Sequence, residues 1–327
     1  MAIEASAPGK AILFGEHSVV YRGPAVVLAI DKRARVVAQK RNDDRVFLDA
    51  LDLGFAGYFE EEKYHAVVGE RKRGRSLAAF NTAALKTMEH LDVESGVSLS
   101  IRSEIPIAAG LGSSAAVSVA TVAAIGALLG GGLTKDEVCS LAYEGEKVVH
   151  GTPSGVDNNI STYGGILKFE RDVGFEKYTL DHSPVFIIGN TRRKRSTRRM
   201  VEKVRLLRNR NEQIVDNVID AIGNIAVEGL NALHRADLET VGDLMDINHG
   251  LLASLGVSSP DLELMVHASR RSGALGSKLT GAGGGGCMIA LTEDASIQRI
   301  QRAIRRRGGE SIIVNISQEG VTTREIG

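Results

Sequence analysis

Residues 106–116, PIAAGLGSSAA, place two glycines and two serines directly before a long run rich in alanine and valine. A strand, a glycine loop and a helix in that order direct unpaired backbone N–H groups and the positive end of a helix dipole to one point. Such a point can bind phosphate oxygens, and the hydroxyls of Ser113 and Ser114 could add ligands for phosphate or Mg²⁺. The alternative is a helix that is only capped after a glycine turn. The pattern favours phosphate binding, although it is not a Walker A loop.

Two carboxylates follow this loop, in the segment EGEKVVHGTPSGVDN at residues 144–158. Glu146 lies near the end of a predicted helix, and Asp157 comes after a Thr-Pro-Ser-Gly turn. One carboxylate beside a phosphate loop could hold Mg²⁺, and another could accept the proton of an attacking hydroxyl. Asp157 could equally be the N-cap of a helix that begins at NNISTY. The segment alone leaves both roles open.

Two further segments carry candidate groups. Near the N-terminus, APGKAILFGEHSVVYRG holds Lys10 among apolar neighbours, with Glu16 and His17 after a predicted strand. A lysine in that setting is suited to a partly buried role beside another charge. Near the C-terminus, KLTGAGGGGC contains five glycines in residues 281–286, too many for a strand or helix interior. That loop either lets the backbone approach a substrate closely or is a flexible turn between two strands.

A basic run lies between these segments, with ten lysines and arginines in residues 192–210. Binding of nucleic acid is one interpretation, but no aromatic residues interleave for base stacking. The other interpretation, a solvated helix face, is favoured. The edge of the run that includes Arg195, Ser196 and Thr197 could still reach an anionic substrate.

The elements that must position these groups follow from hydrophobic periodicity. Runs rich in Val, Ile and Leu predict strands at residues 10–15, 25–30, 34–39, 97–103, 164–169, 185–190, 276–281, 287–292, 311–316 and 321–326. Helical patterns lie at residues 77–91, 113–129, 134–151, 197–209, 212–228, 238–255, 260–272 and 297–306. Ser113 is the expected N-cap of the second helix, and Thr134 forms a capping box with Glu137 at the start of the third.

The order of these elements predicts an α+β fold with two lobes. The composition changes near residues 175–190, where long helices with polar faces begin. Residues 1–180 are therefore expected to form an N-terminal nucleotide-binding lobe with the glycine loop and Asp157. Residues 181–327 are expected to form a C-terminal α/β lobe with the second glycine run and strands at both of its ends.

Composition excludes several classes of protein. The chain has 327 residues, 43% apolar and 24% charged, which is typical of a soluble globular protein. Its 40 basic residues balance 40 acidic ones, so no global field favours nucleic acid or a membrane surface as a partner. The uncharged run 105–134 is dominated by Ala, Gly and Ser, and predicts a buried helix rather than a membrane span. Two cysteines and no signal peptide predict a cytoplasmic protein.

Three of the segments, taken in order, resemble the signatures of the GHMP small-molecule kinases over nearly the whole chain. Within that superfamily, APGKAILFGEHSVVYRGPAV, HGTPSGVDN and KLTGAGGGGC are most similar to the mevalonate kinases. Galactokinases usually continue from Gly-Glu-His into Thr-Asp-Tyr, where this chain has Ser-Val-Val. The resemblance implies a two-lobed fold, a homodimer, and a reaction with ATP and Mg²⁺. That reaction is phosphorylation of the primary hydroxyl of mevalonate, in isoprenoid biosynthesis.

The resemblance also assigns roles to individual residues. Asp157 matches the catalytic aspartate that receives the proton of the alcohol, and Lys10 matches the lysine that pairs with it and keeps it ionised. Ser114 and Glu146 match the Mg²⁺ ligands. The residues matched to ATP binding are Pro106, Ala109, Gly110, Leu111, Gly112, Ser113, Ser114 and Ala115. Those matched to the substrate region are Glu16, His17, Ser154, Gly155, Arg195, Ser196, Thr197, Gly281, Ala282 and Gly283.

Two positions depart from the family, since Thr152 stands where Asn is frequent and Met288 where a small Gly is frequent. Neither change removes a catalytic group. Two other functions remain open. A related GHMP kinase could phosphorylate phosphomevalonate or a sugar, and a non-catalytic protein could bind ATP and a metabolite to regulate a partner. The intact set of Lys10, Glu146 and Asp157 favours an active kinase.

Overall fold

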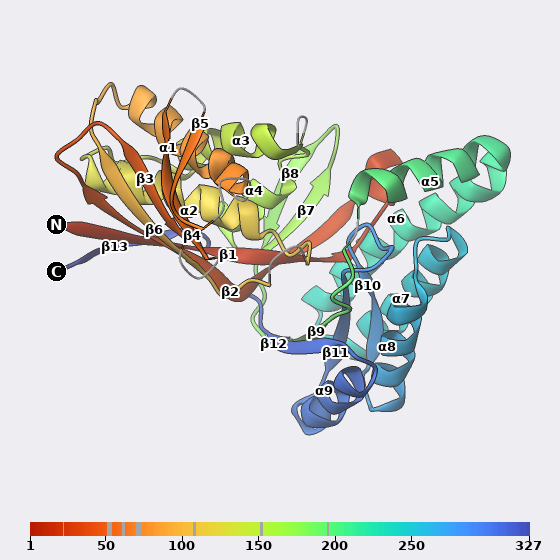
Figure 1. The fold of residues 1–327 in the computed structure, drawn as a ribbon. Helices are drawn as coiled ribbons and strands as arrows, with labels where there is room; N and C mark the ends of the chain where they lie inside the picture. Colours follow the sequence, from red (N-terminus) through yellow and green to blue (C-terminus); the bar gives the residue numbers. More distant parts are fainter. Residues whose placement is uncertain are drawn as a thin grey trace.

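The computed structural model describes residues 1–21, 23–50, 54–60, 63–69, 74–106, 109–150, 153–194 and 196–327. In this part of the chain, two sheets each have helices packed against them (Figure 1). The predicted α+β fold is therefore confirmed.

The first sheet is built on two long antiparallel strands, β1 (Ala2–Phe14) and β2 (Ala25–Lys40). Its described strands run in the order β13-β1-β2-β6-β3-β4-β5, and β7 extends it from β2 to β8. The other strands are β3 (Val46–Ala50), β4 (Phe55–Glu60), β5 (Lys63–Val68), β6 (Val97–Ser103), β7 (Ile166–Glu170), β8 (Gly174–Tyr178) and β13 (Thr322–Ile326). The sequence did not predict β3, β4, β5 or β8, because glycines and charged residues interrupt their short apolar patterns.

The strand β2 is a single element, whereas the sequence predicted separate strands at residues 25–30 and 34–39. Its pairing with β1 shifts register between Ile30 and Arg33, at the predicted break. The charged residues between the two patterns suggested a break, but the chain forms distant hydrogen bonds there. The Asp31 N–H donates to the Asn315 carbonyl at 3.0 Å, and the Arg33 guanidinium donates to the Ser6 hydroxyl at 2.7 Å. Contacts that no local pattern reveals therefore keep the strand intact.

The last strand, β13, pairs with β1, so the two chain termini lie side by side (Figure 1). The sequence predicted this strand at the end of the second lobe. Arg33 helps to hold the segment before β13 at the first sheet, because it also donates to the Ser317 hydroxyl at 3.0 Å and to the Gly320 carbonyl at 2.6 Å.

Helices cover one face of the first sheet (Figure 1). They are α1 (Ala78–His90), α2 (Ser113–Leu128), α3 (Lys135–His150) and α4 (Val156–Tyr163). The helix α2 packs directly on β1 and β2, and the other three pack around it. The predicted capping box of α3 is confirmed, because the Thr134 N–H donates to Glu137 Oε2 at 2.7 Å and the Glu137 N–H donates to Thr134 Oγ1 at 3.3 Å.

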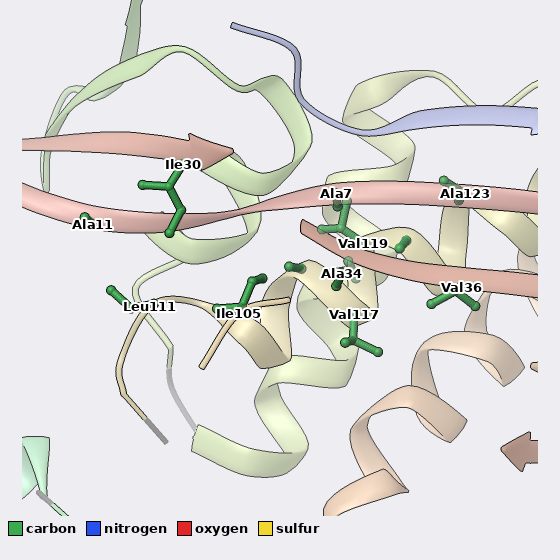
Figure 2. Close-up of a cluster of buried hydrophobic side chains, with 14 of the residues drawn as sticks. Ala7, Ala11, Ile30, Ala34, Val36, Ile105, Leu111, Val117, Val119 and Ala123 are labelled. Atoms are coloured by element: carbon green, nitrogen blue, oxygen red, sulfur yellow. The ribbon is translucent and has the colours of Figure 1, made fainter. Parts of the chain in front are cut away.

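The helix α2 is buried along most of its length, as its lack of charged residues predicted. Figure 2 shows Val117 and Val119 of this helix near Ala34 of β2. Ile105 and Leu111 belong to the same apolar cluster and are each 1% exposed. Ile105 lies before the glycine loop and Leu111 lies within it, between Gly110 and Gly112, so buried side chains anchor the loop at its start and in its middle. Among the described helices, none is both long and apolar enough to cross a membrane.

The second sheet is antiparallel, in the order β10-β11-β9-β12. Its strands are β9 (Val185–Asn190), β10 (Gly276–Thr280), β11 (Cys287–Thr292) and β12 (Glu310–Val314). The helices of this part are α5 (Thr197–Arg210), α6 (Glu212–His234), α7 (Leu238–Ser254), α8 (Pro260–Arg271) and α9 (Ile297–Arg306). The helix α6 continues past the predicted end at residue 228, because Leu230 and Leu233 extend its buried face. The lobe boundary near residue 180 stays a prediction.

Candidate active site

Lys10 and Asp157 form an ion pair, with Lys10 Nζ 3.1 Å from Asp157 Oδ1. Lys10 lies on β1 just after a register shift between Pro8 and Gly9, and Asp157 lies in the first turn of α4. The Ser161 hydroxyl donates to the Pro8 carbonyl at 2.8 Å and so fixes α4 to β1. The Lys10 side chain is 9% exposed and that of Asp157 is 37% exposed. The carboxylate is therefore held by a buried cation and stays accessible to a substrate.

The glycine loop lies directly against Lys10. The Lys10 N–H donates to the Leu111 carbonyl at 2.8 Å. Gly112 has a φ of +75°, and a Cβ there would lie 2.8 Å from Lys10 Cγ. A Cβ on Gly9 would lie 2.8 Å from the Leu111 carbonyl oxygen. Glycine at these two positions lets the loop and the lysine approach each other.

The start of α2 differs from the sequence prediction by one residue. Gly112, not Ser113, is the N-cap, and no side chain caps the first turn. Ser113 is the first helical residue, and its Oγ lies 3.3 Å from Ser103 Oγ. Ser114 and Ala115 follow in the same turn. Because Gly112 has no side chain, the first N–H groups of α2 are left without a capping side chain. This arrangement fits oxygens of a phosphate chain.

The start of α4 settles the alternative role of Asp157. The N-cap is Gly155, with a φ of +78°, and Asp157 lies inside the first turn. Ser154 Oγ accepts a hydrogen bond from the Val156 N–H at 3.4 Å. Asp157 is therefore not the cap of this helix, and its carboxylate pairs with Lys10 instead.

The two candidate Mg²⁺ ligands lie on helices that pack against each other. Ser114 is half-buried in the first turn of α2, and Glu146 is 3% exposed on α3. A hydroxyl and a carboxylate are the hard oxygen donors that Mg²⁺ prefers. Among the described residues, no three His, Cys, Asp or Glu side chains gather as a metal site. A Mg²⁺ held by one or two protein oxygens and by phosphates needs no such group.

Glu16 lies just beyond β1, and its carboxylate pairs with the ammonium of Lys278 on β10. Both side chains are 0% exposed. Burial raises the pKa of Glu16 and lowers that of Lys278, and each charge opposes the shift of the other. The Asn248 side-chain amide also donates to Glu16 Oε2 at 3.3 Å. The sequence did not predict a role for Lys278 or Asn248. Lys278 begins the KLTGAGGGGC segment, but nothing in its local pattern indicates that its side chain is buried.

His17 connects the loop after β1 to the second glycine run. Its Nε2 donates to the Ala282 carbonyl at 3.0 Å, and its φ is +63°. Burial lowers the pKa of His17 below its usual value, which favours the neutral ring. A Cβ on Gly283 would lie 2.1 Å from the Val257 carbonyl oxygen, so only glycine fits there. The second glycine run, which includes Gly281, is thus packed against its neighbours rather than free.

The segment before α5 borders the same glycine run. The Gly286 N–H donates to the Arg193 carbonyl at 3.2 Å. Ser196 is the N-cap of α5 and accepts from the Arg199 N–H at 3.3 Å, so Thr197 begins the helix. Arg195 lies outside the described residues, as do Thr152 and the predicted helix end at Gly151. The helix α5 buries only Val204, as expected of a solvated face.

Comparison with known proteins identifies the family. The N-terminal domain of the GHMP kinases matches residues 78–165, and their C-terminal domain matches residues 230–310. The mevalonate kinase of Thermococcus sibiricus is 39% identical over 334 residues, which cover 100% of this chain and 99% of the relative. The crystal structure of the Methanococcus jannaschii mevalonate kinase is 30% identical, with a TM-score of 0.82, and the match covers 97% of this chain and 98% of that one.

A second crystal structure, of L. major mevalonate kinase in complex with R-mevalonate, is 27% identical with a TM-score of 0.82. The match covers 95% of both chains. The sequence and structural matches both extend over nearly the full length of the chain. The chain belongs to the GHMP kinases and, within them, to the mevalonate kinases.

Proposed function

We propose that this protein transfers the γ-phosphoryl group of ATP to the primary hydroxyl of mevalonate and forms 5-phosphomevalonate for isoprenoid biosynthesis. The observation that carries the proposal is the Lys10–Asp157 pair, held against the glycine loop at the start of α2. Full-length similarity to mevalonate kinases, one of which was crystallised with R-mevalonate, supports this choice of acceptor.

Asp157 orients the acceptor hydroxyl and accepts its proton as the oxygen attacks phosphorus. Its exposed carboxylate can be reached by a hydroxyl, and general base catalysis needs such direct contact. Lys10 stabilises the ionised carboxylate from the buried side. Because the Lys10 N–H is bonded to the Leu111 carbonyl, the same residue also fixes the loop beside the attacking group. Phosphoryl transfer depends chiefly on such positioning and on charge stabilisation.

Ala109, Gly110, Leu111, Gly112, Ser113, Ser114 and Ala115 would surround the phosphate chain with backbone N–H groups. Pro106, which has no N–H, would only shape the start of the loop. Ser114 and Glu146 would hold Mg²⁺, which when bound neutralises charge on the phosphates. The substrate region would include Ser154 and Gly155 beside Asp157 and the Gly281–Gly283 turn near His17. Ser196 and Thr197, at the start of α5, would approach the anionic end of the substrate.

The function is tested by ADP release from Mg·ATP with mevalonate, phosphomevalonate, galactose and homoserine in parallel. Saturable turnover with mevalonate alone is expected, and turnover only with another acceptor would replace mevalonate as the substrate. Asp157→Asn is expected to lower kcat by about 10²–10⁴-fold while ATP binding, measured by calorimetry, is preserved. An Asn variant with full activity would remove Asp157 from the mechanism.

We also propose a cytoplasmic homodimer, with no nucleic-acid or membrane partner. The family resemblance supports the dimer. The low number of cysteines, two in the chain, supports the cytoplasmic location, and the balanced charge supports the absence of a nucleic-acid or membrane partner. Light scattering after size-exclusion chromatography tests the dimer directly.

A further inference from the structure

The buried ion pair of Glu16 and Lys278 joins the two sheets of the molecule. Glu16 follows β1 of the first sheet, and Lys278 lies on β10 of the second. Besides Glu16, the Lys278 ammonium donates to the Leu279 carbonyl at 2.8 Å. The second oxygen of Glu16 accepts from Asn248 on α7. Both charged groups are therefore hydrogen-bonded in place, and neither reaches solvent.

Stability alone does not account for such a pair. Removing two charges from water costs several kcal/mol per ion, and well-packed apolar residues in place of a buried pair are often equally stable or more so. What a buried pair can provide is a fixed geometry, because each charge is satisfied in one arrangement only. The segments that carry the two residues show what this geometry would fix.

Two further contacts join the same two segments, beside the Glu16–Lys278 pair. The Thr280 hydroxyl donates to the Ile12 carbonyl at 2.8 Å and accepts from the Ile12 N–H at 3.2 Å. His17 Nε2 donates to the Ala282 carbonyl. Residues 12–17 are thus connected at three points to residues 278–282. The first segment continues β1 from Lys10, and the second leads into the glycine run 281–286.

We propose that the Glu16–Lys278 pair is a positioning device for phosphoryl transfer, which sets the glycine run and His17 relative to Lys10 and Asp157. Lys278 is a positioning residue in this scheme, since its side chain is fully buried and cannot touch substrate. Glu16, assigned to the substrate region from the family resemblance, acts through Lys278 instead. This proposal rests on the proposed function.

The test compares Glu16→Gln, Lys278→Met and the double variant. Glu16→Gln is isosteric, and the double variant removes both charges, so no charge is left buried alone. We expect the double variant to melt near the wild-type temperature while its kcat stays at least about tenfold low, with KM for Mg·ATP changed by less than about threefold. A double variant that regains wild-type kcat would show that the pair is only structural.

Arg270→Met is the matched control. Arg270 pairs with Asp246 at 2.8 Å and donates to the Ser277 carbonyl at 2.7 Å, so it supports the residue next to Lys278 without reaching the first sheet. We expect this variant to melt earlier but to keep kcat within about threefold of wild type. If it loses as much kcat as Lys278→Met, any disturbance of β10 is sufficient and the proposal is overturned.

Two measurements keep the outcome decisive. If Lys278→Met does not fold, Glu16→Gln carries the test, and a folded Gln variant with wild-type kcat contradicts the proposal. Hydrogen exchange of residues 12–17 and 278–286 is measured in all variants, and we expect faster exchange in both segments when the pair is removed. If the wild type releases no ADP with mevalonate, the proposed function fails. In that case hydrogen exchange alone tests whether the Glu16–Lys278 pair fixes the two segments. Unchanged exchange rates in both segments would overturn that role.

Discussion

Gly112→Ala probes the contact between the glycine loop and Lys10. The new Cβ would lie 2.8 Å from Lys10 Cγ, whereas ordinary contacts begin at 3.4 Å, so the lysine stem must shift by more than half an ångström. Its backbone cannot follow, because the Lys10 N–H is bonded to the Leu111 carbonyl. The shift is therefore transmitted to the ammonium that pairs with Asp157. A misplacement approaching 1 Å can cost about 100-fold in rate, so we expect kcat to fall about 10–100-fold, or about 1.4–2.7 kcal/mol in activation free energy.

Gly130→Ala is the matched control, at the other end of α2. Gly130 has a φ of +86°, but a Cβ there would meet nothing within 4 Å. Both variants place alanine in the left-handed region, which costs about 1–2 kcal/mol. Only Gly112→Ala also displaces Lys10.

The assay is steady-state turnover at saturating Mg·ATP and mevalonate, with the free energy of unfolding measured in urea. We expect Gly130→Ala to lose about 1–2 kcal/mol of stability and to keep wild-type kcat. Gly112→Ala should lose at least as much stability, together with the fall in kcat. Equal kcat values for the two variants would refute the argument, because backbone strain alone would then explain both.

Three further predictions concern stability. Burial lowers the pKa of His249 to about 4, although the Glu263 carboxylate opposes the shift. Below pH 6.5 the unfolded chain therefore binds a proton at His249 that the folded protein does not bind. The wild type should lose about 2 kcal/mol of unfolding free energy between pH 7 and pH 5, and His249→Gln should lose less over the same range. Gly229→Ala should destabilise the protein by about 1–3 kcal/mol in urea unfolding, since its Cβ would lie 2.3 Å from Phe14 Cε2. Gly250→Ala should instead stabilise it by about 0.5–1 kcal/mol, because a Cβ at this helical position would meet nothing within 4 Å. A destabilised Gly250 variant would contradict the packing argument. Arg33→Ala should lower the unfolding free energy by about 2 kcal/mol and expose residues 315–327 to limited proteolysis, because Arg33 donates to Ser317 and Gly320. Unchanged proteolysis would show that β13 holds this segment without Arg33.

The sequence was sufficient for the elements that local patterns determine. Helix α9 begins and ends at the predicted residues, and α1 and α3 lie within a residue or two of theirs. The approach of Lys10 to the glycine loop could also be expected, because the family resemblance names both. The pairing with Asp157 needed that resemblance as well, since a lone aspartate after a turn is equally consistent with a helix cap.

The remaining features depend on contacts between residues far apart in the chain. In β2, Arg33 donates to Ser317 and Gly320, and β13 pairs with β1 of the first sheet rather than with the second sheet. Lys278 begins the KLTGAGGGGC segment, but the sequence does not show that it is buried and paired with Glu16, 262 residues away. Local periodicity carries no information about such pairs.

These long-range contacts lie at the edges of the candidate site rather than inside it. Ser161 holds α4 to β1 through the Pro8 carbonyl, and the Val321 N–H, in the C-terminal segment, donates to the Thr162 carbonyl at 3.1 Å. Asp157 is thus carried on a short helix that both ends of the chain hold in place. On the opposite side, the Glu16–Lys278 pair connects β1 to the second glycine run. Since β1 carries Lys10 and takes part in both connections, it is the element through which a shift in either sheet would reach the reacting groups.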